Sequence, residues 1–146
     1  MIQRIQSIFL FLASAATFGL FGLPFASTPD AVSSSTIFGD TLYNLQDHVA
    51  SLVLFGLAGL LALVAIFLFK NRKLQLNLSR VALVANIIGL VLAIILYVGD
   101  SDTLGAIEPN DEAGLYMPFI AVVFLGLALR FISKDEKLVK SMDRLR

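Results

Sequence analysis

Apolar residues fill four long stretches of the chain, at 7–25, 49–69, 79–98 and 115–133, and polar residues gather between them. Each stretch has about 20 residues, which as an α-helix is about 30 Å long, the thickness of the hydrocarbon core of a bilayer. None contains an acidic residue, and the apolar positions run all round a helix instead of along one stripe. Because open strands cannot satisfy their backbone groups in lipid, the pattern predicts four transmembrane helices.

Composition agrees with a chain whose solvent is lipid. Hydrophobic residues make up 58% of the sequence and charged residues 15%, with a mean hydropathy of +0.85; soluble domains are about 45–50% apolar and about 25% charged. The chain has no cysteine, which excludes disulfides, a thiolate nucleophile and cysteine metal sites. We therefore expect residues 1–146 to form a single integral membrane domain.

The positive charges predict an orientation. All eleven basic residues lie at the N-terminus, around the connection 70–78, or at the end of the fourth stretch and in the tail 134–146: Arg4, Lys70, Arg72, Lys73, Arg80, Arg130, Lys134, Lys137, Lys140, Arg144 and Arg146. The connections 26–48 and 99–114 carry only acidic charges and the single histidine. Since basic residues remain on the cytoplasmic side of membranes, both termini are expected in the cytoplasm.

The first apolar stretch has a second interpretation, as a signal peptide. Arg4 would be its basic start, and Ala13, Ser14 and Ala15 resemble a cleavage site of small residues. The apolar run continues to residue 25, beyond the usual length of such a segment. Cleavage would leave three spans in the same orientation.

Two segments outside the spans have features of their own. In the long connection 26–48, Gly39 and Asp40 stand between short apolar pairs and could form a two-residue hairpin turn. In the tail 134–146, Leu138 and Met142 recur at helical spacing. Ser133 with Glu136 matches a capping box, and the alternative is that the fourth helix continues out of the membrane. The tail is thus interpreted as a short cytoplasmic helix, serving as a solvated basic extension, a lipid-surface helix or a docking helix.

Small residues mark the faces on which the spans would pack. Gly56 and Gly59 fall in the second stretch, and Ala85 and Gly89 in the third are four residues apart, a spacing that lets helix backbones approach closely. Asn86 is the most polar residue near the middle of any span, and we expect it to hydrogen-bond between helices.

A search for chemical machinery identifies no cofactor site, metal site or nucleic-acid stripe, so we expect no enzyme. His48 follows Asp47, but adjacent helical residues do not face each other. A membrane enzyme that uses Asp40, Asp47 and His48 is therefore the weakest hypothesis.

Three segments resemble the DUF4293 family: MIQRIQSIFL at 1–10, FKNRKLQ at 69–75 and KDEKLVKSMDRLR at 134–146. This family consists of small four-helix membrane proteins of Bacteroidota without an established function. The resemblance implies a location in the inner membrane of a diderm bacterium, and it supplies no catalytic residues.

The expected fold is an all-α, four-transmembrane-helix bundle with both termini in the cytoplasm. The leading functional hypothesis is an accessory, structural or assembly subunit of a larger inner-membrane complex, in contact with lipids and other subunits. Its docking residues would be Arg4, Arg72, Leu138, Met142 and Arg144. The alternative is a small transporter or channel for a neutral or lipid-like solute, with a pore lined by Asn86, Ser14 and Thr17.

Overall fold

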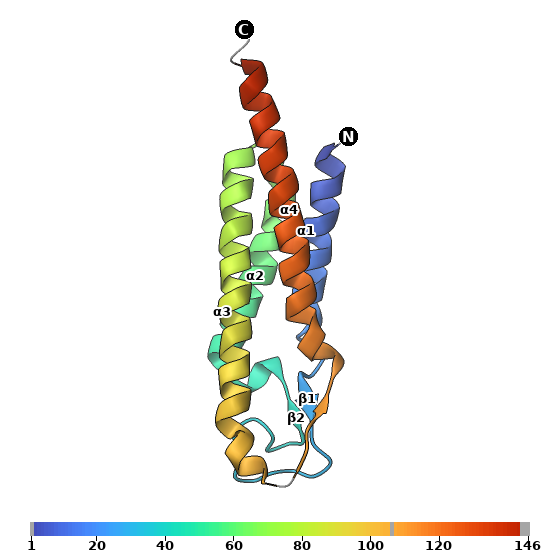
Figure 1. Cartoon of the computed structure of the whole chain (residues 1–146), viewed down its shortest axis with the longest axis vertical. Helices are drawn as coiled ribbons and strands as arrows, with labels where there is room; N and C mark the ends of the chain where they lie inside the picture. The colour runs from blue at the N-terminus through green and yellow to red at the C-terminus, as the bar shows by residue number, and fades with distance from the viewer. Residues whose placement is uncertain (1, 106, 144–146) are drawn as a thin grey trace.

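Four long helices stand side by side in the computed structural model, which describes residues 2–105 and 107–143 (Figure 1). They are α1 (Ile2–Gly19), α2 (Val49–Phe67), α3 (Arg72–Leu104) and α4 (Ala113–Asp143). The 3₁₀-helix η1 (Leu45–Asp47) and the short strands β1 (Ala26–Ser27), β2 (Leu42–Tyr43) and β3 (Asn110–Asp111) lie in the connections. The start of α1 and the end of α4 lie at the same end of the bundle (Figure 1). We call it the basic end because the described lysines and arginines belong to α1, α3, α4 and the connection between α2 and α3, in segments toward that end.

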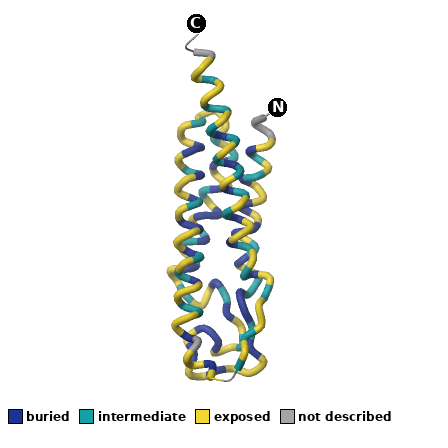
Figure 2. The backbone as a smooth tube through the Cα atoms, in the orientation of Figure 1, coloured by how far each residue is buried: buried dark blue, intermediate teal, exposed yellow. Residues whose placement is uncertain are grey.

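The packing of the helices is the reverse of that in a water-soluble bundle. Alanines such as Ala13, Ala62 and Ala128 are buried, whereas many large aliphatic and aromatic residues are exposed on all four helices. Figure 2 shows exposed residues along the length of every helix. In lipid, outward leucine and valine cost nothing, and small interior residues let helix backbones approach closely. This arrangement is what a bilayer favours.

Three helices, α2, α3 and α4, are long and apolar enough to cross a membrane, and the described apolar part of α1, Ile5–Gly19, is shorter. The prediction of an all-helical fold with membrane-spanning helices is thus supported. Helix α1 ends at Gly19, earlier than the apolar run that continues to residue 25. Tight i+3 turns of the backbone follow, at Leu20, Phe21 and Gly22, before Pro24.

The connection predicted to hold a hairpin turn folds differently. Strand β1 pairs with β2 on one edge and with β3 on the other, both antiparallel, so residues 28–41 separate the first two strands. A tight turn does form at Gly39 and Asp40, where the Thr41 amide donates to the Phe38 carbonyl at 3.3 Å. No pair of strands begins directly beside it, so the predicted turn is confirmed and the predicted hairpin is wrong. The pattern of short apolar pairs instead reflects burial of Ile37 and Phe38.

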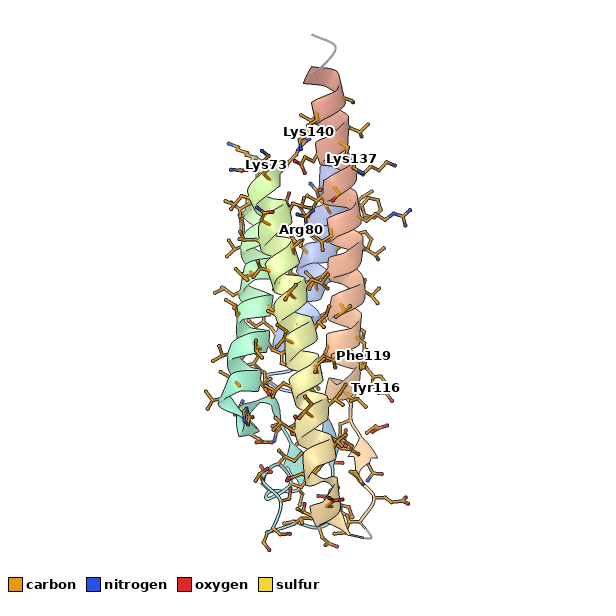
Figure 3. The ribbon with its side chains drawn as sticks, turned by 60° about the vertical axis from the view of Figure 1, so that its left-hand side comes forward. Lys73, Arg80, Tyr116, Phe119, Lys137 and Lys140 are labelled. Atoms are coloured by element: carbon orange, nitrogen blue, oxygen red, sulfur yellow. The ribbon has the colours of Figure 1, made fainter. Side chains whose placement is uncertain are left out.

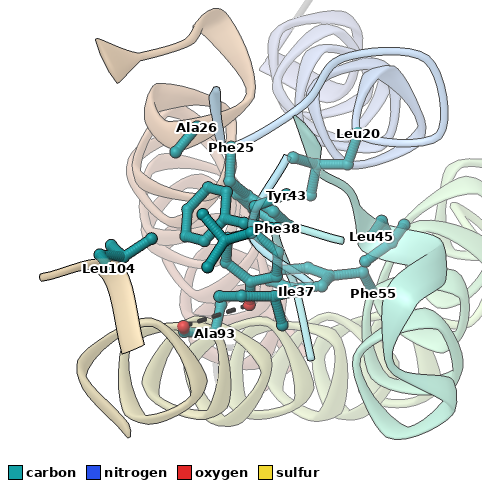
Figure 4. Close-up of a cluster of buried hydrophobic side chains, with 11 residues drawn as sticks. Leu20, Phe25, Ala26, Ile37, Phe38, Tyr43, Leu45, Phe55, Ala93 and Leu104 are labelled. Atoms are coloured by element: carbon teal, nitrogen blue, oxygen red, sulfur yellow. Dashed lines mark hydrogen bonds between the residues drawn. The ribbon is translucent and has the colours of Figure 1, made fainter. Parts of the chain in front are cut away.

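A hydrophobic cluster is enclosed by connection 20–48, the first turns of α2 and the last turns of α3. Phe38, Phe55 and Leu45 are almost fully buried in it, together with Phe25 and Tyr43 (Figure 4). The rings of Phe25 and Tyr43 lie 5.0 Å apart, centroid to centroid. The folded segment 20–48 closes the end of the bundle opposite the basic end. We call it the acidic cap because its charged residues are acidic.

The tail does not form a separate helix. Helix α4 continues without a break from Ala113 to Asp143, with Pro118 in its second turn. Ser133 therefore lies in the middle of a helix, and the predicted capping box with Glu136 does not exist as a helix start. The backbone donors that a cap would satisfy are already bonded within the helix.

Candidate functional site

The glycines expected at helix contacts face aromatic rings of neighbouring helices. A Cβ added at Gly59 of α2 would lie 3.1 Å from the ring of Phe18 of α1, and one at Gly89 of α3 would lie 3.0 Å from the ring of Phe55 of α2. At Gly56 the nearest atom, in the ring of Phe21, would be 3.7 Å away. The glycines thus make room for phenylalanine rings.

A small polar layer lies inside the bundle between α1, α2 and α3. Asn86 is fully buried beside the buried Ala85, and its Nδ2 donates to Thr17 Oγ1 at 3.3 Å. Thr17 in turn donates to the Ala13 carbonyl at 2.9 Å, and Ser14 donates to the Gly59 carbonyl at 3.1 Å. The structure therefore brings together Asn86, Thr17 and Ser14, the three residues expected along a pore. Each forms a hydrogen bond between helices or within one helix.

Replacing Gly89 with leucine is expected to weaken the contact between α2 and α3. The Phe55 ring occupies the space, and overpacking of this kind costs about 1–3 kcal/mol. Thermal unfolding in detergent measures the loss. Gly99→Leu on the same helix is the matched control, because a Cβ there meets nothing within 4 Å; equal melting temperatures for the two variants would contradict the prediction.

At the basic end, α3 and α4 are joined by charge. The guanidinium of Arg72 lies 3.3 Å from the carboxylate of Asp135 and also donates to the Asp135 backbone carbonyl at 3.3 Å. One turn away, Lys140 and Glu136 of α4 form an ion pair at 2.7 Å. Arg72, which was expected as a docking residue, thus forms an ion pair within the chain.

The other expected docking residues have different positions. Leu138 lies on the last turns of α4 with 44% of its surface exposed. Arg4 and Met142 lie in helices α1 and α4, where the structure describes only their backbone. Arg144 lies outside the described residues. Of the five expected docking residues, only Leu138 is thus described with an exposed side chain at the basic end.

The acidic cap is held by a carboxylate that the sequence analysis did not single out. Asp100, in the last turns of α3 beyond the apolar run, is buried, and one of its oxygens accepts hydrogen bonds from the Ser35 hydroxyl and the backbone of Thr36 and Ile37. Burial raises the pKa of this carboxyl, but the bonds from Ser35, Ile37 and Thr36 outweigh it and hold the pKa below its ordinary value. The serine-rich run at 33–35 is the signal that could have indicated such an anchor.

Tyr43 fixes the cap to the middle of α3. Its hydroxyl donates to the Ala93 carbonyl at 3.2 Å (Figure 4). Burial, and to a lesser extent the charge of Asp47, raise the pKa of Tyr43, so the hydroxyl remains a donor at any physiological pH. Beside it lies an apolar cavity of about 120 Å³ that also borders Leu90 and Tyr97.

Of the residues in the enzyme hypothesis, Asp47 serves local structure, and the Nδ1 of His48 is buried without a hydrogen-bond partner among the described residues. Asp47 accepts a hydrogen bond from the backbone of Asn44 at 2.6 Å and so caps η1. Burial raises the pKa of Asp47, the Asn44 bond opposes this, and the charge of Asp40 adds to the rise. The part of the chain that the structure describes contains no group of three acidic or histidine residues able to hold a metal.

Comparison with known proteins identifies the family of this chain. The family model named domain of unknown function DUF4293 matches residues 2–145, nearly the whole chain. The chain belongs to the DUF4293 family. This DUF4293 chain matches no curated protein and no solved structure. The family resemblance seen in the sequence is thereby confirmed, and any function has to be argued from the geometry.

Proposed function

We propose that this DUF4293 chain is an accessory or assembly subunit of a larger complex in the bacterial inner membrane. In this proposal all four helices span the membrane, both termini are cytoplasmic, and the end of α4 binds the partner. The observation that supports it is the projection of α4, which continues to Asp143 beyond the ends of the other helices (Figure 1).

The projecting turns of α4 carry an apolar side chain in charged surroundings. Leu138 is 44% exposed next to the exposed Lys137, at a level where the chain has left its apolar run. At 100° per residue, Leu138 points about 200° away from Glu136, which faces α3. Met142 continues the same face in the sequence, four residues later. A partner helix or groove that covers this face would bury the leucine and meet the lysines at its rim.

The test is purification from native membranes in mild detergent, followed by mass spectrometry and particle sizing. A stoichiometric protein partner is expected with the wild type and should be lost with Leu138→Glu, because a buried unpaired carboxylate opposes association. Lys140→Gln, on the opposite face of α4, is the matched control and should retain the partner. Purification as a free monomer, without a partner, would contradict the proposal.

A free monomer would instead favour transport of a neutral solute. One observation supports this second function. Buried polar side chains continue from Asn86 toward the basic end, at Ser79, Gln75 and Gln6. The Gln6 amide has no hydrogen-bond partner within the described residues, and the Asn86 Oδ1 likewise has none there. Such groups could bind a passing solute, and Asn86 would then be the first residue to change.

A further inference from the structure

A polar groove lies between α3 and α4 at the basic end, on the side of α4 opposite Leu138. Its cavity volume is about 440 Å³. The lining residues, four from one face of α3 and two from α4, are Lys73, Leu76, Asn77, Arg80, Glu136 and Lys140. The α3 residues follow the i, i+3, i+4, i+7 spacing of a single helix face. Figure 3 shows Lys73 and Lys140 at this end of the two helices and Arg80 nearer the middle of the bundle.

The groove has a surplus of positive charge. Three cations face one carboxylate, and that carboxylate, Glu136, is already paired with Lys140. Lys73 and Arg80 form no ion pair with any residue that the structure describes. The ion pair between Arg72 and Asp135 lies next to the groove and holds its two walls together. The groove thus carries a net positive charge, and Lys73 and Arg80 act on Glu136 through their charge without a direct ion pair among the described residues.

The groove opens where the helix surface changes from polar to apolar. Directly after Arg80, the exposed side chains of α3 are Val81 and Val84, which lipid tails would cover. Leu76, buried, forms an apolar wall of the groove. An occupant with an anionic head and an apolar tail could therefore bind the cations with its head and the valines with its tail.

We propose that this groove binds the phosphate of an anionic phospholipid in the leaflet that meets the basic end. A guanidinium and two ammonium groups are strong donors to phosphate oxygens, and basic pockets between membrane helices suit anionic headgroups. A soluble phosphate would gain the same polar contacts but none along Val81 and Val84. The groove lies on the opposite face of α4 from Leu138, so the inference does not depend on the proposed protein partner.

The experiment is a titration of delipidated protein in neutral detergent, read by native mass spectrometry. Phosphatidylglycerol is compared with phosphatidylcholine of identical acyl chains and with glycerol 3-phosphate. We expect phosphatidylglycerol to bind at low concentration and the other two to bind at least about tenfold more weakly. Equal binding of phosphatidylcholine, or binding of glycerol 3-phosphate as tight as that of the lipid, would overturn the proposal.

Variants assign the binding to the groove. Arg80→Gln and Lys73→Gln should each weaken phosphatidylglycerol binding about tenfold, by removal of a charge-assisted contact. Both side chains are exposed and unpaired within the described chain, so the fold should persist. Arg130→Gln, an exposed arginine of α4 outside the groove, is the control and should bind as the wild type does.

A gain of binding provides an outcome that misfolding cannot imitate. Glu136→Gln removes the carboxylate that competes with phosphate for Lys140, so phosphatidylglycerol should bind severalfold more tightly. Weaker binding in this variant would contradict the proposal. Equal losses in Arg80→Gln and Arg130→Gln would show that the lipid is attracted by overall charge and not by the groove.

Discussion

Replacement of Gly114 by alanine is expected to separate the start of α4 from the segment that follows α1 and to destabilise the acidic cap. An added Cβ would overlap the carbonyl oxygen of Pro24 and lie 2.5 Å from that of Leu23. Both obstacles are backbone atoms, which cannot rotate aside as a side chain can. The Gly114 amide also donates to the Pro24 carbonyl at 2.9 Å, so any shift breaks that bond. We expect a loss of about 3 kcal/mol or more.

The measurement is thermal or denaturant unfolding in detergent, with Gly126→Ala as the matched control on the same helix. A Cβ at Gly126 meets nothing within 4 Å, and alanine favours a helix over glycine by up to about 1 kcal/mol, so this variant should be as stable as the wild type or slightly more stable. If Gly114→Ala were as stable as the control, the close approach of Gly114 to Pro24 would be disproved.

The consequence of Gly114→Ala should concentrate in the cap because neighbouring bonds depend on the same contact. The Glu112 amide donates to the Phe25 carbonyl at 3.1 Å, and the Ser27 hydroxyl donates to the Glu112 carboxylate at 2.8 Å. These bonds, together with the pairing of β1 and β3, connect the segment before α4 to the segment after α1. Hydrogen exchange should therefore rise first at the donor amides of Glu112 and Gly114.

The helices could be predicted from the sequence because the decisive property is local. A run of about 20 apolar residues determines by itself that the backbone must bond internally in lipid, whatever the rest of the chain does. The ends of the helices were predicted less accurately, because the apolar run does not determine where a helix stops. Where α1 ends depends on the turn at 20–22, and α4 continues past residue 133 because the charged segment from Lys134 remains helical.

The contacts between distant segments could not be predicted in this way. The spacing of Gly59 and Gly89 predicts close approach of helices, but not that Phe18 and Phe55 fill the space. Gly114 is a loop glycine by its neighbours, and its role depends on Pro24, which lies far away in the sequence. Asp100 likewise is one of several acids in an acidic connection, distinguished only by the serine-rich segment that folds onto it.

Replacement of Asp100 by alanine is expected to release the segment 35–38 from the end of α3. One carboxylate oxygen holds the Thr36 amide at 2.8 Å, the Ile37 amide at 3.1 Å and the Thr36 hydroxyl at 3.2 Å, in addition to the Ser35 hydroxyl. Bonds to a charged acceptor contribute about 1.5–3 kcal/mol each, and water can replace only part of this where the donors are buried. We expect a local loss of about 3 kcal/mol, and amide exchange about 100-fold faster at Thr36 and Ile37.

The control is Asp102→Ala, because Asp102 has the same charge two residues away but is exposed. Equal exchange rates in the two variants would mean that the carboxylate of Asp100 contributes no more than its surface charge.

The pH dependence gives an independent test of the same anchor. Since folding lowers the pKa of Asp100, its contribution to stability is complete above the unfolded value of about 3.9 and is lost as the pH falls through the folded value. The difference between wild type and Asp100→Ala should therefore be constant near neutrality and vanish in acid. Asp100→Asn keeps the shape of the side chain but not its charge, so exchange in this variant should resemble that of the acidified wild type. If both exchange faster than the wild type at neutral pH, the anchor depends on the negative charge, because both retain the shape of the side chain.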